Sequence, residues 1–185
     1  RLLHLVGRLD RGRLPCQLVP VTPGQEFEIS RELVVTTLPT QHTVPSLGFI
    51  VWERRKKLKP EFVGLPGEKI RDLRLGGVEV TNEIRMPRVA YLGDTRVDVL
   101  DQYPELLRSE VLIMEVTFVS PHHRRDKIRK FGHVHIDDIV ERRDLFNNEV
   151  VIASHFSIRY SPKLIERLVR KALPDMLGGR LQIWL

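Results

Sequence analysis

The chain has 185 residues, 42% of them hydrophobic, which is enough for one compact domain with a sizeable core. No run of about 18 apolar residues occurs, so we expect no membrane span. The single cysteine, Cys16, excludes an internal disulfide and indicates a reducing compartment, so we expect a cytoplasmic protein. The net charge of +6 favours a polyanionic partner, with nucleic acid first and an acidic membrane surface second, and a basic but inert surface is the alternative.

The start of the chain is unusual, because it begins at Arg1 rather than at a methionine. The opening stretch "RLLHLVGRLDRGR" is too short and too often interrupted by arginine to be a signal peptide. Its apolar runs are typical of the middle of a domain. We therefore expect a fragment, a processed chain or a protein whose beginning is missing.

The first half of the chain predicts short strands followed by a basic excursion. Turn signals separate the predicted strands, which cover residues 16–21, 26–29, 33–38 and 48–53. Residues 53–75 then contain eight Lys or Arg against four Asp or Glu, with two prolines. We interpret this stretch as an excursion from the core, extending over about 53–85, with a short helix near 68–73.

The second half predicts strands that alternate with helices. Buried strands are expected at 88–93 and 110–118, a helix at 136–146, and further strands at 149–154 and 180–185. The clearest helix begins after Ser161, a good N-cap, with Pro162 at its first position and Pro174 beyond its end. This alternation indicates an α/β layered domain.

Three polar side chains stand directly beyond apolar strands. His42 follows "LVVTTLPTQ", Asp94 follows "VAYLG" and His155 follows "VVIAS". Strand ends on one edge of a sheet converge, so these residues can meet in space. Two imidazoles and a carboxylate suit zinc or a similar divalent metal, although a histidine beyond a strand is more often structural.

Five stretches, in order, carry a resemblance to a known family: "TQHTVPSLGFIV", "AYLGDTR", "LIMEVTF", "GHVHIDDI" and "SHFSIRY". From about residue 15 to the end, the sequence resembles the C-terminal half of ribonuclease Z, in the short form found in plants and some bacteria. That family is the tRNA 3′-processing branch of the metallo-β-lactamase fold. The resemblance implies that residues 1–185 supply half of an αββα sandwich, as a mixed sheet with flanking helices.

The resemblance also implies a two-zinc centre, with Mn²⁺ as an alternative metal. His42 matches a ligand of the first zinc, Asp94 the carboxylate that bridges both zincs, and His155 a ligand of the second. Glu115 and His133 match a carboxylate–imidazole pair that protonates the leaving oxygen. A buried salt link between a helix and a strand is the alternative for this pair.

His135 occupies the threonine position of the family's His-Ser-Thr motif, where this sequence reads His-Val-His. It could therefore be the acting histidine instead of its neighbour two residues earlier.

Further residues are expected to bind phosphate. Arg159 would hold phosphate oxygens near the metals, with an ion pair as its alternative role, and Ser157 would add a hydroxyl hydrogen bond. The family inserts a tRNA-binding arm between the positions of His42 and Asp94. Four consecutive cations lie in this part of the sequence: Arg54, Arg55, Lys56 and Lys57. With a second basic cluster at 124–130, these would form a track for a phosphate backbone if both flank the cleft.

The His-x-His-x-Asp-His run that the family's metal sites also need does not occur in the sequence. His122 and His123 do not replace it, because adjacent side chains point apart. We therefore expect a zinc-dependent endoribonuclease that removes the 3′ trailer of precursor tRNA as a homodimer, incomplete and inactive in this chain alone. The alternatives are another phosphodiesterase or hydrolase of the same fold, and a non-catalytic RNA-binding module.

Overall fold

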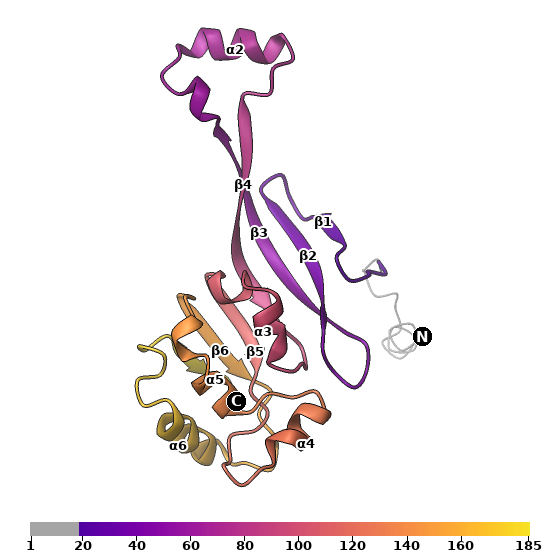
Figure 1. The fold of residues 1–185 in the computed structure, drawn as a ribbon, viewed down its shortest axis with the longest axis vertical. Helices are drawn as coiled ribbons and strands as arrows, with labels where there is room; N and C mark the ends of the chain where they lie inside the picture. The colour runs from indigo at the N-terminus through magenta and orange to yellow at the C-terminus, as the bar shows by residue number, and fades with distance from the viewer. Residues whose placement is uncertain (1–18) are drawn as a thin grey trace, which may run out of the picture.

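A computed structural model describes residues 19–185 as a single seven-stranded mixed sheet with helices beside it (Figure 1). The strands lie in sequence order, antiparallel from β1 to β4 and parallel from β4 to β7. Their bounds are β1 Glu26–Glu28, β2 Leu33–Thr40, β3 Ser46–Leu58, β4 Thr81–Tyr91, β5 Val111–Glu115, β6 Val150–Ser154 and β7 Leu181–Ile183. The α/β class and the mixed sheet with flanking helices are confirmed.

Two sequence-based predictions concern the beginning of the chain. Cys16 and most of the strand predicted at 16–21 lie outside the described residues, and residues 19–21 form no strand. Within residues 19–185 no helix is long and apolar enough to cross a membrane.

Strands β3 and β4 extend far beyond the rest of the sheet and form an arm (Figure 1). The excursion predicted at about 53–85 lies in this arm, where β3 stays paired with β4 as far as Leu58 opposite Thr81. Ion pairs between the two strands support this pairing: Glu83 pairs with Arg54, and Glu53 pairs with Arg88. The tip carries a 3₁₀ turn at Pro60–Phe62 and the helix α2, Gly67–Leu75, near the predicted helix.

One face of the sheet forms the core. Side chains on this face include Ile50, Ala90, Leu112 and Val151, which lie opposite one another in adjacent strands and are at most 2% exposed. They pack with apolar side chains from the helical segments, among them Leu100 and Val169. The helical segments outside the arm are α3 Asp98–Gln102, a 3₁₀ turn at Leu106–Arg108, α4 Arg125–Lys130, α5 Ile136–Val140, a 3₁₀ turn at Arg143–Leu145 and α6 Pro162–Ala172. All of them except α4 and the turn at Arg143–Leu145 contribute side chains to this core.

The opposite face of the sheet is also apolar but only partly covered. Val51, Val89, Val111 and Val150 form one row across four strands, and all four are half-buried. In the next row Tyr91 is 48% exposed. A face this apolar resembles a sheet surface that packs against another layer.

The helices α5 and α6 test two predictions. α6 begins and ends where the sequence indicated, although the Ser161 side chain makes no capping hydrogen bond. The single helix predicted at 136–146 is wrong, because α5 ends at Val140. There the N–H of Arg142 bonds to the carbonyl of Ile139 rather than that of Asp138, so the turn tightens and the helix stops.

Candidate metal and catalytic site

Four functional side chains meet at one edge of the sheet. His42 lies in the turn between β2 and β3, Asp94 follows β4, His155 follows β6, and His133 precedes α5. The Asp94 carboxylate is 3.4 Å from His155 Nε2 and 4.0 Å from His42 Nε2. The His133 ring lies between the other two imidazoles, with centroids 5.0 Å from His42 and 5.9 Å from His155.

These side chains fit a divalent metal in chemistry and in spacing. Asp94, His133 and His155 each offer a ligand atom, and these atoms lie within 4.8 Å of one another. Imidazole nitrogen and carboxylate oxygen are suitable ligands for zinc and related metals. The three residues that the sequence predicted as ligands are therefore neighbours, and the structure adds His133 to the group.

Each of the three imidazoles is held through its Nδ1 atom, which leaves Nε2 for the centre of the cluster. His42 Nδ1 is 3.1 Å from the carbonyl of Gly132. His133 Nδ1 is 2.9 Å from Glu115 Oε1, and His155 Nδ1 is 3.0 Å from the Thr117 hydroxyl. Partners of this kind orient the histidines of metal centres and fix which ring nitrogen carries the proton.

Gly132 makes the contact with His42 possible. Its backbone has a φ of +78°, in the left-handed region, and a Cβ there would lie 2.7 Å from both Cα and Nδ1 of His42. Only glycine allows the two backbones to approach this closely. The position was missed in the sequence, although a glycine directly before His133 is a signal that could have been used.

Glu115 is the centre of the hydrogen-bond network behind the cluster. It is 1% exposed, and a buried carboxylate needs donors on both oxygens. The N–H groups of Thr95, Thr117 and Val134 donate to it at 3.0, 3.2 and 3.3 Å. With the His133 ring and the Thr117 hydroxyl as further partners, the charge is fully satisfied.

Thr117 links this carboxylate to a second histidine. Its hydroxyl lies within hydrogen-bond distance of Glu115 Oε2 and of His155 Nδ1. An ionised carboxylate only accepts, so the hydroxyl donates to Glu115 and accepts the Nδ1–H of His155. His155 itself has a φ of 57°, an uncommon conformation for a residue with a side chain, as is frequent at functional sites.

His135 lies outside the cluster and has a structural position. It is 1% exposed, and its Nδ1 accepts the N–H of Asp137 as the N-cap of α5. Its Nε2 donates to the carbonyl of Ser120 at 2.9 Å. Both ring nitrogens are occupied, so the imidazole of the His-Val-His sequence that faces the cluster is His133.

The predicted phosphate-binding residues form two groups, one beside the cluster and one on the arm. Arg159 is exposed and lines a cavity together with His42 and His133, beside the cluster. Ser157 supports its loop, because its N–H donates to the carbonyl of Thr117 and its hydroxyl accepts the N–H of Arg159.

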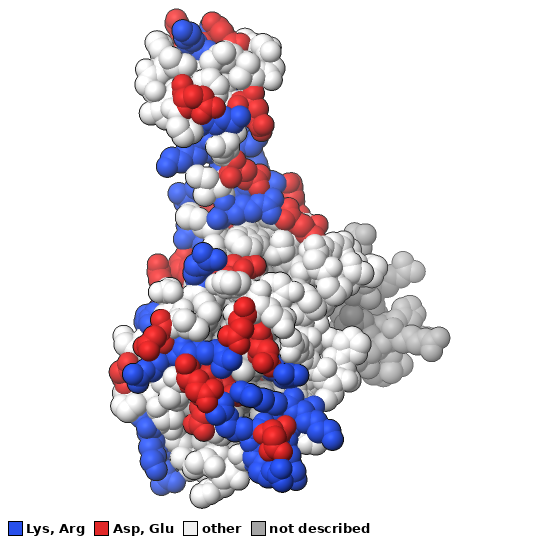
Figure 2. Space-filling model, in the orientation of Figure 1, with Lys and Arg blue, Asp and Glu red and all other residues white. Residues whose placement is uncertain are grey.

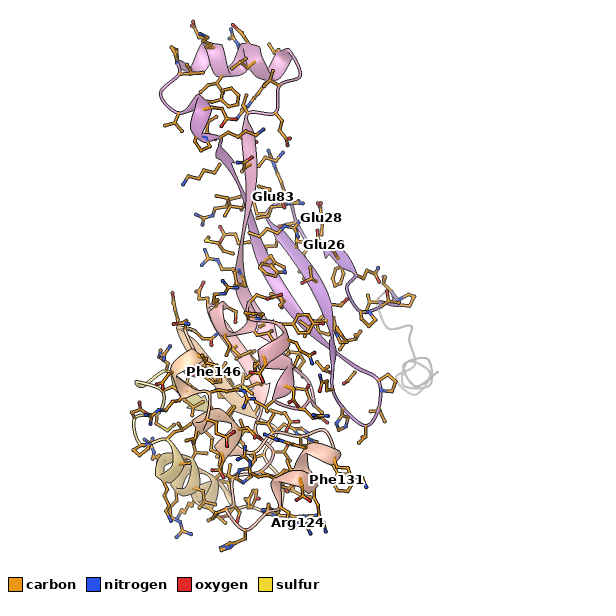
Figure 3. The ribbon with its side chains drawn as sticks, in the orientation of Figure 1. Glu26, Glu28, Glu83, Arg124, Phe131 and Phe146 are labelled. Atoms are coloured by element: carbon orange, nitrogen blue, oxygen red, sulfur yellow. The ribbon has the colours of Figure 1, made fainter. Side chains whose placement is uncertain are left out.

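The four arm cations lie away from the cluster. Arg54 stands eight residues beyond Ser46 along β3, which corresponds to about 26 Å of strand. Arg54 pairs with Glu28 and Glu83, and Arg55 pairs with Glu53. Glu28 and Glu83 lie on the ribbon well away from α4 (Figure 3). Among residues 19–185, Lys56 and Lys57 have no ion-pair partner, so of these four cations they are the two available to bind phosphate.

The condition for a single phosphate track, that both basic clusters flank the cleft, is therefore not met by the four arm cations. The segment 124–130 lies beside the histidines, and it contributes Arg124 and Lys127 to the same cavity as His42. In Figure 2, Lys and Arg gather over this part of the molecule and along the arm. The two basic clusters therefore lie on different parts of the molecule.

Sequence comparison finds relatives among plant proteins, while no family model matches the chain. The chain is 40% identical over 181 residues to "tRNase Z TRZ1" of Arabidopsis thaliana, a match that covers 97% of this chain and 64% of that protein. It is 32% identical over 173 residues to the chloroplastic tRNase Z TRZ2 of the same plant, covering 92% of this chain and 49% of the relative. The chain thus spans about half to two thirds of the length of these relatives.

Structural comparison gives the fold. The metallo-β-lactamase fold protein YhfI from Bacillus subtilis superposes with a TM-score of 0.54 at 12% sequence identity, covering 90% of this chain and 52% of that one. The fold predicted from the sequence motifs is confirmed, and so is the resemblance that those motifs carry.

Proposed function

Because this chain is a relative of the ribonuclease Z proteins, we propose that the whole protein is a zinc-dependent endoribonuclease that removes the 3′ trailer of precursor tRNA. The observation that carries this proposal is the cluster of three imidazoles around Asp94, each held through Nδ1. Mn²⁺ suits the same donor set.

In this proposal His42, Asp94 and His155 are the residues of this chain that would hold the metal. Bound divalent metal would supply an activated water and neutralise charge on the scissile phosphate. His133 gives the proton of its Nε2 to the 3′ oxygen that leaves, while Glu115 holds the ring from behind. Arg159, at the edge of the cluster, binds phosphate oxygens.

We further propose that residues 1–185 form the C-terminal half of a two-layered αββα domain. The half-buried apolar row of Val51, Val89, Val111 and Val150 supports this, since a second sheet would cover it. The remaining ligands, in a His-x-His-x-Asp-His run, would then come from the other half. On this basis the chain alone binds metal weakly and does not catalyse.

The partner is precursor tRNA, bound on two surfaces of the chain. The segment 124–130 contacts the RNA near the scissile bond, and Lys56 and Lys57 contact it at a distance through the arm. We place the protein in the cytoplasm and expect it to act as a homodimer.

The direct test uses the full-length protein with a precursor tRNA that carries a labelled trailer. Cleavage at the 3′ end of the mature tRNA should require added or retained metal, and metal analysis of the purified protein should detect zinc. Asp94→Asn should abolish cleavage and lower metal content, while Asp144→Asn, a change at a fully exposed aspartate far from the cluster, should leave both unchanged. Tight tRNA binding without cleavage in the metal-loaded protein would instead favour a non-catalytic RNA-binding module.

A further inference from the structure

A cavity of about 500 Å³ lies beside the metal cluster, between the β2–β3 turn and α4. His42 and His133 line it, whereas Asp94 and His155 do not. Its size is within the range of small-molecule pockets in proteins. We call it the α4 pocket.

One wall of the α4 pocket is aromatic and apolar. Phe118 and Phe131 contribute to it together with Ile128. The Phe131 side chain stands at the outer end of α4 and is 58% exposed, although phenylalanine is usually buried (Figure 3). Phe118 packs edge-on against His133, with ring centroids 6.0 Å apart, so the aromatic wall reaches the cluster.

The other wall carries positive charge. Arg124, Lys127 and Arg159 line the pocket. Arg124 pairs with Asp126 at 2.6 Å, but Lys127 and Arg159 have no ion-pair partner among residues 19–185. Exposed aromatic rings beside unpaired cations are the surface that binds single-stranded nucleic acid, with the base on the ring and phosphates on the cations.

The position of His133 indicates which nucleotide enters. A proton donor must approach the oxygen that it protonates to about 3 Å. The nucleotide bearing the departing 3′ oxygen is therefore the one next to His133. In an in-line displacement the leaving oxygen and the attacking water lie on opposite sides of the phosphorus. The trailer stays bonded to the phosphorus through a third oxygen.

We propose that the α4 pocket binds the nucleotide whose 3′ oxygen departs, which becomes the last nucleotide of the product. Its base stacks on Phe131, and its own 5′ phosphate lies by Lys127. This assignment rests on the proposed endoribonuclease function and adds to it a specific subsite on the product side of the scissile bond.

The test combines a variant with modified substrates, using the full-length protein. Phe131→Ala should lower kcat/KM for precursor tRNA by about 5- to 100-fold, as expected for loss of one base–aromatic stack. On a precursor with an abasic ribose at the last product nucleotide, the same variant should differ from the unaltered protein by less than about 2-fold, since no base remains to stack. An abasic ribose at the first trailer nucleotide should leave the full effect of the variant in place.

Phe27→Ala is the matched control, because Phe27 is also a surface phenylalanine but lies on β1. It should not change kcat/KM on any of the three substrates. An equal loss for Phe131→Ala on the unmodified and product-side abasic substrates would overturn the proposal. The proposal would also be overturned if the loss of kcat/KM for Phe131→Ala disappeared only with the trailer-side abasic substrate. The pocket would then bind the trailer.

Failure of the proposed function can be recognised separately. If the unaltered protein does not cleave precursor tRNA, that function is wrong, and the pocket is then tested by calorimetric titration with adenosine 5′-monophosphate and cytidine 5′-monophosphate. Weaker binding to Phe131→Ala than to Phe27→Ala supports a nucleotide pocket, and equal binding to both variants overturns it.

Discussion

Replacing Thr117 by valine removes one hydroxyl group and keeps the shape of the side chain. That hydroxyl joins Glu115 to His155, and it is nearly buried, with 6% of the residue exposed. The substitution therefore separates two effects. The carboxylate loses one of its donors, and the Nδ1–H of His155 loses its acceptor.

The two effects differ in size and in the property they change. A hydrogen bond to a charged group contributes about 1.5–3 kcal/mol, and Glu115 keeps its bonds to three N–H groups and to His133. We expect the free energy of unfolding of Thr117→Val to fall by about 1–2 kcal/mol, because the added methyl group is favourable in this site. For His155, losing the group that orients a ligand typically costs about 10- to 100-fold in metal affinity.

The assay measures these quantities on the full-length protein. Denaturant unfolding of the metal-free form gives the stability, and competition with a metal-binding dye gives the affinity. Nitrogen chemical shifts of the metal-free His155 ring report whether Nδ1 still carries the proton. Thr117→Ser is the control, because it keeps the hydroxyl and should keep both the affinity and the ring proton. If Thr117→Val loses stability but binds metal as tightly as Thr117→Ser, the hydroxyl does not position His155 and the reasoning is refuted.

Four other substitutions test the surrounding structure. Gly132→Ala forces a side chain into a left-handed backbone and against the adjacent histidine, so its stability should fall by at least about 1–3 kcal/mol in denaturant unfolding, and a variant as stable as the unaltered protein would contradict the geometry. His133→Ala should lower turnover by about 10²- to 10⁴-fold, whereas His135→Ala should lower the melting temperature and leave the turnover of the folded protein much less affected; the reverse order would identify the other histidine as the acid. Arg142 lowers the pKa of Asp101 through a two-pronged hydrogen-bonded ion pair, so this pair stabilises the fold above the ordinary carboxyl pKa of 3.8 and its contribution is lost as the pH falls below that value. Asp101→Asn should thus be less stable than the unaltered protein at pH 6, with the gap closing at low pH in thermal unfolding.

Much of the cluster could be predicted because ligand positions follow from strand positions. His42, Asp94 and His155 each come directly after an apolar stretch, and the ends of neighbouring strands lie at the same edge of the sheet. A periodic apolar pattern fixes where a strand runs, so the first polar residue beyond it is placed with little error. The order of the strands, which brings these three ends together, does not follow from the apolar pattern and is seen only in the structure.

The residues that hold the ligands in place were not predictable in the same way. Thr117 and Gly132 act on histidines that lie far away in the sequence, and no local pattern distinguishes them from an ordinary threonine or a turn glycine. Their roles depend on tertiary distances. The same holds for residues 53–58, a charged stretch that forms a strand and pairs its Arg54 with glutamates of two other strands, Glu28 and Glu83.

The partners of the three imidazoles give a physical reason for assigning them different tasks. His42 and His155 donate to a neutral carbonyl and a neutral hydroxyl, which suits rings that present a lone pair from Nε2 to a metal. His133 alone donates to a buried carboxylate, and a hydrogen bond to an ionised acceptor is about twice as strong as one between neutral groups. That bond stabilises the charge which a ring carries when it holds protons on both nitrogens.

His133 is therefore the ring suited to move a proton, even though its position would also let it contact a metal. Glu115 reaches only one of the other two histidines, and does so through the Thr117 hydroxyl rather than directly. The intervening hydroxyl keeps the carboxylate charge away from His155 while still fixing its orientation. A single buried glutamate can in this way prepare one histidine for proton transfer and its neighbour for metal binding.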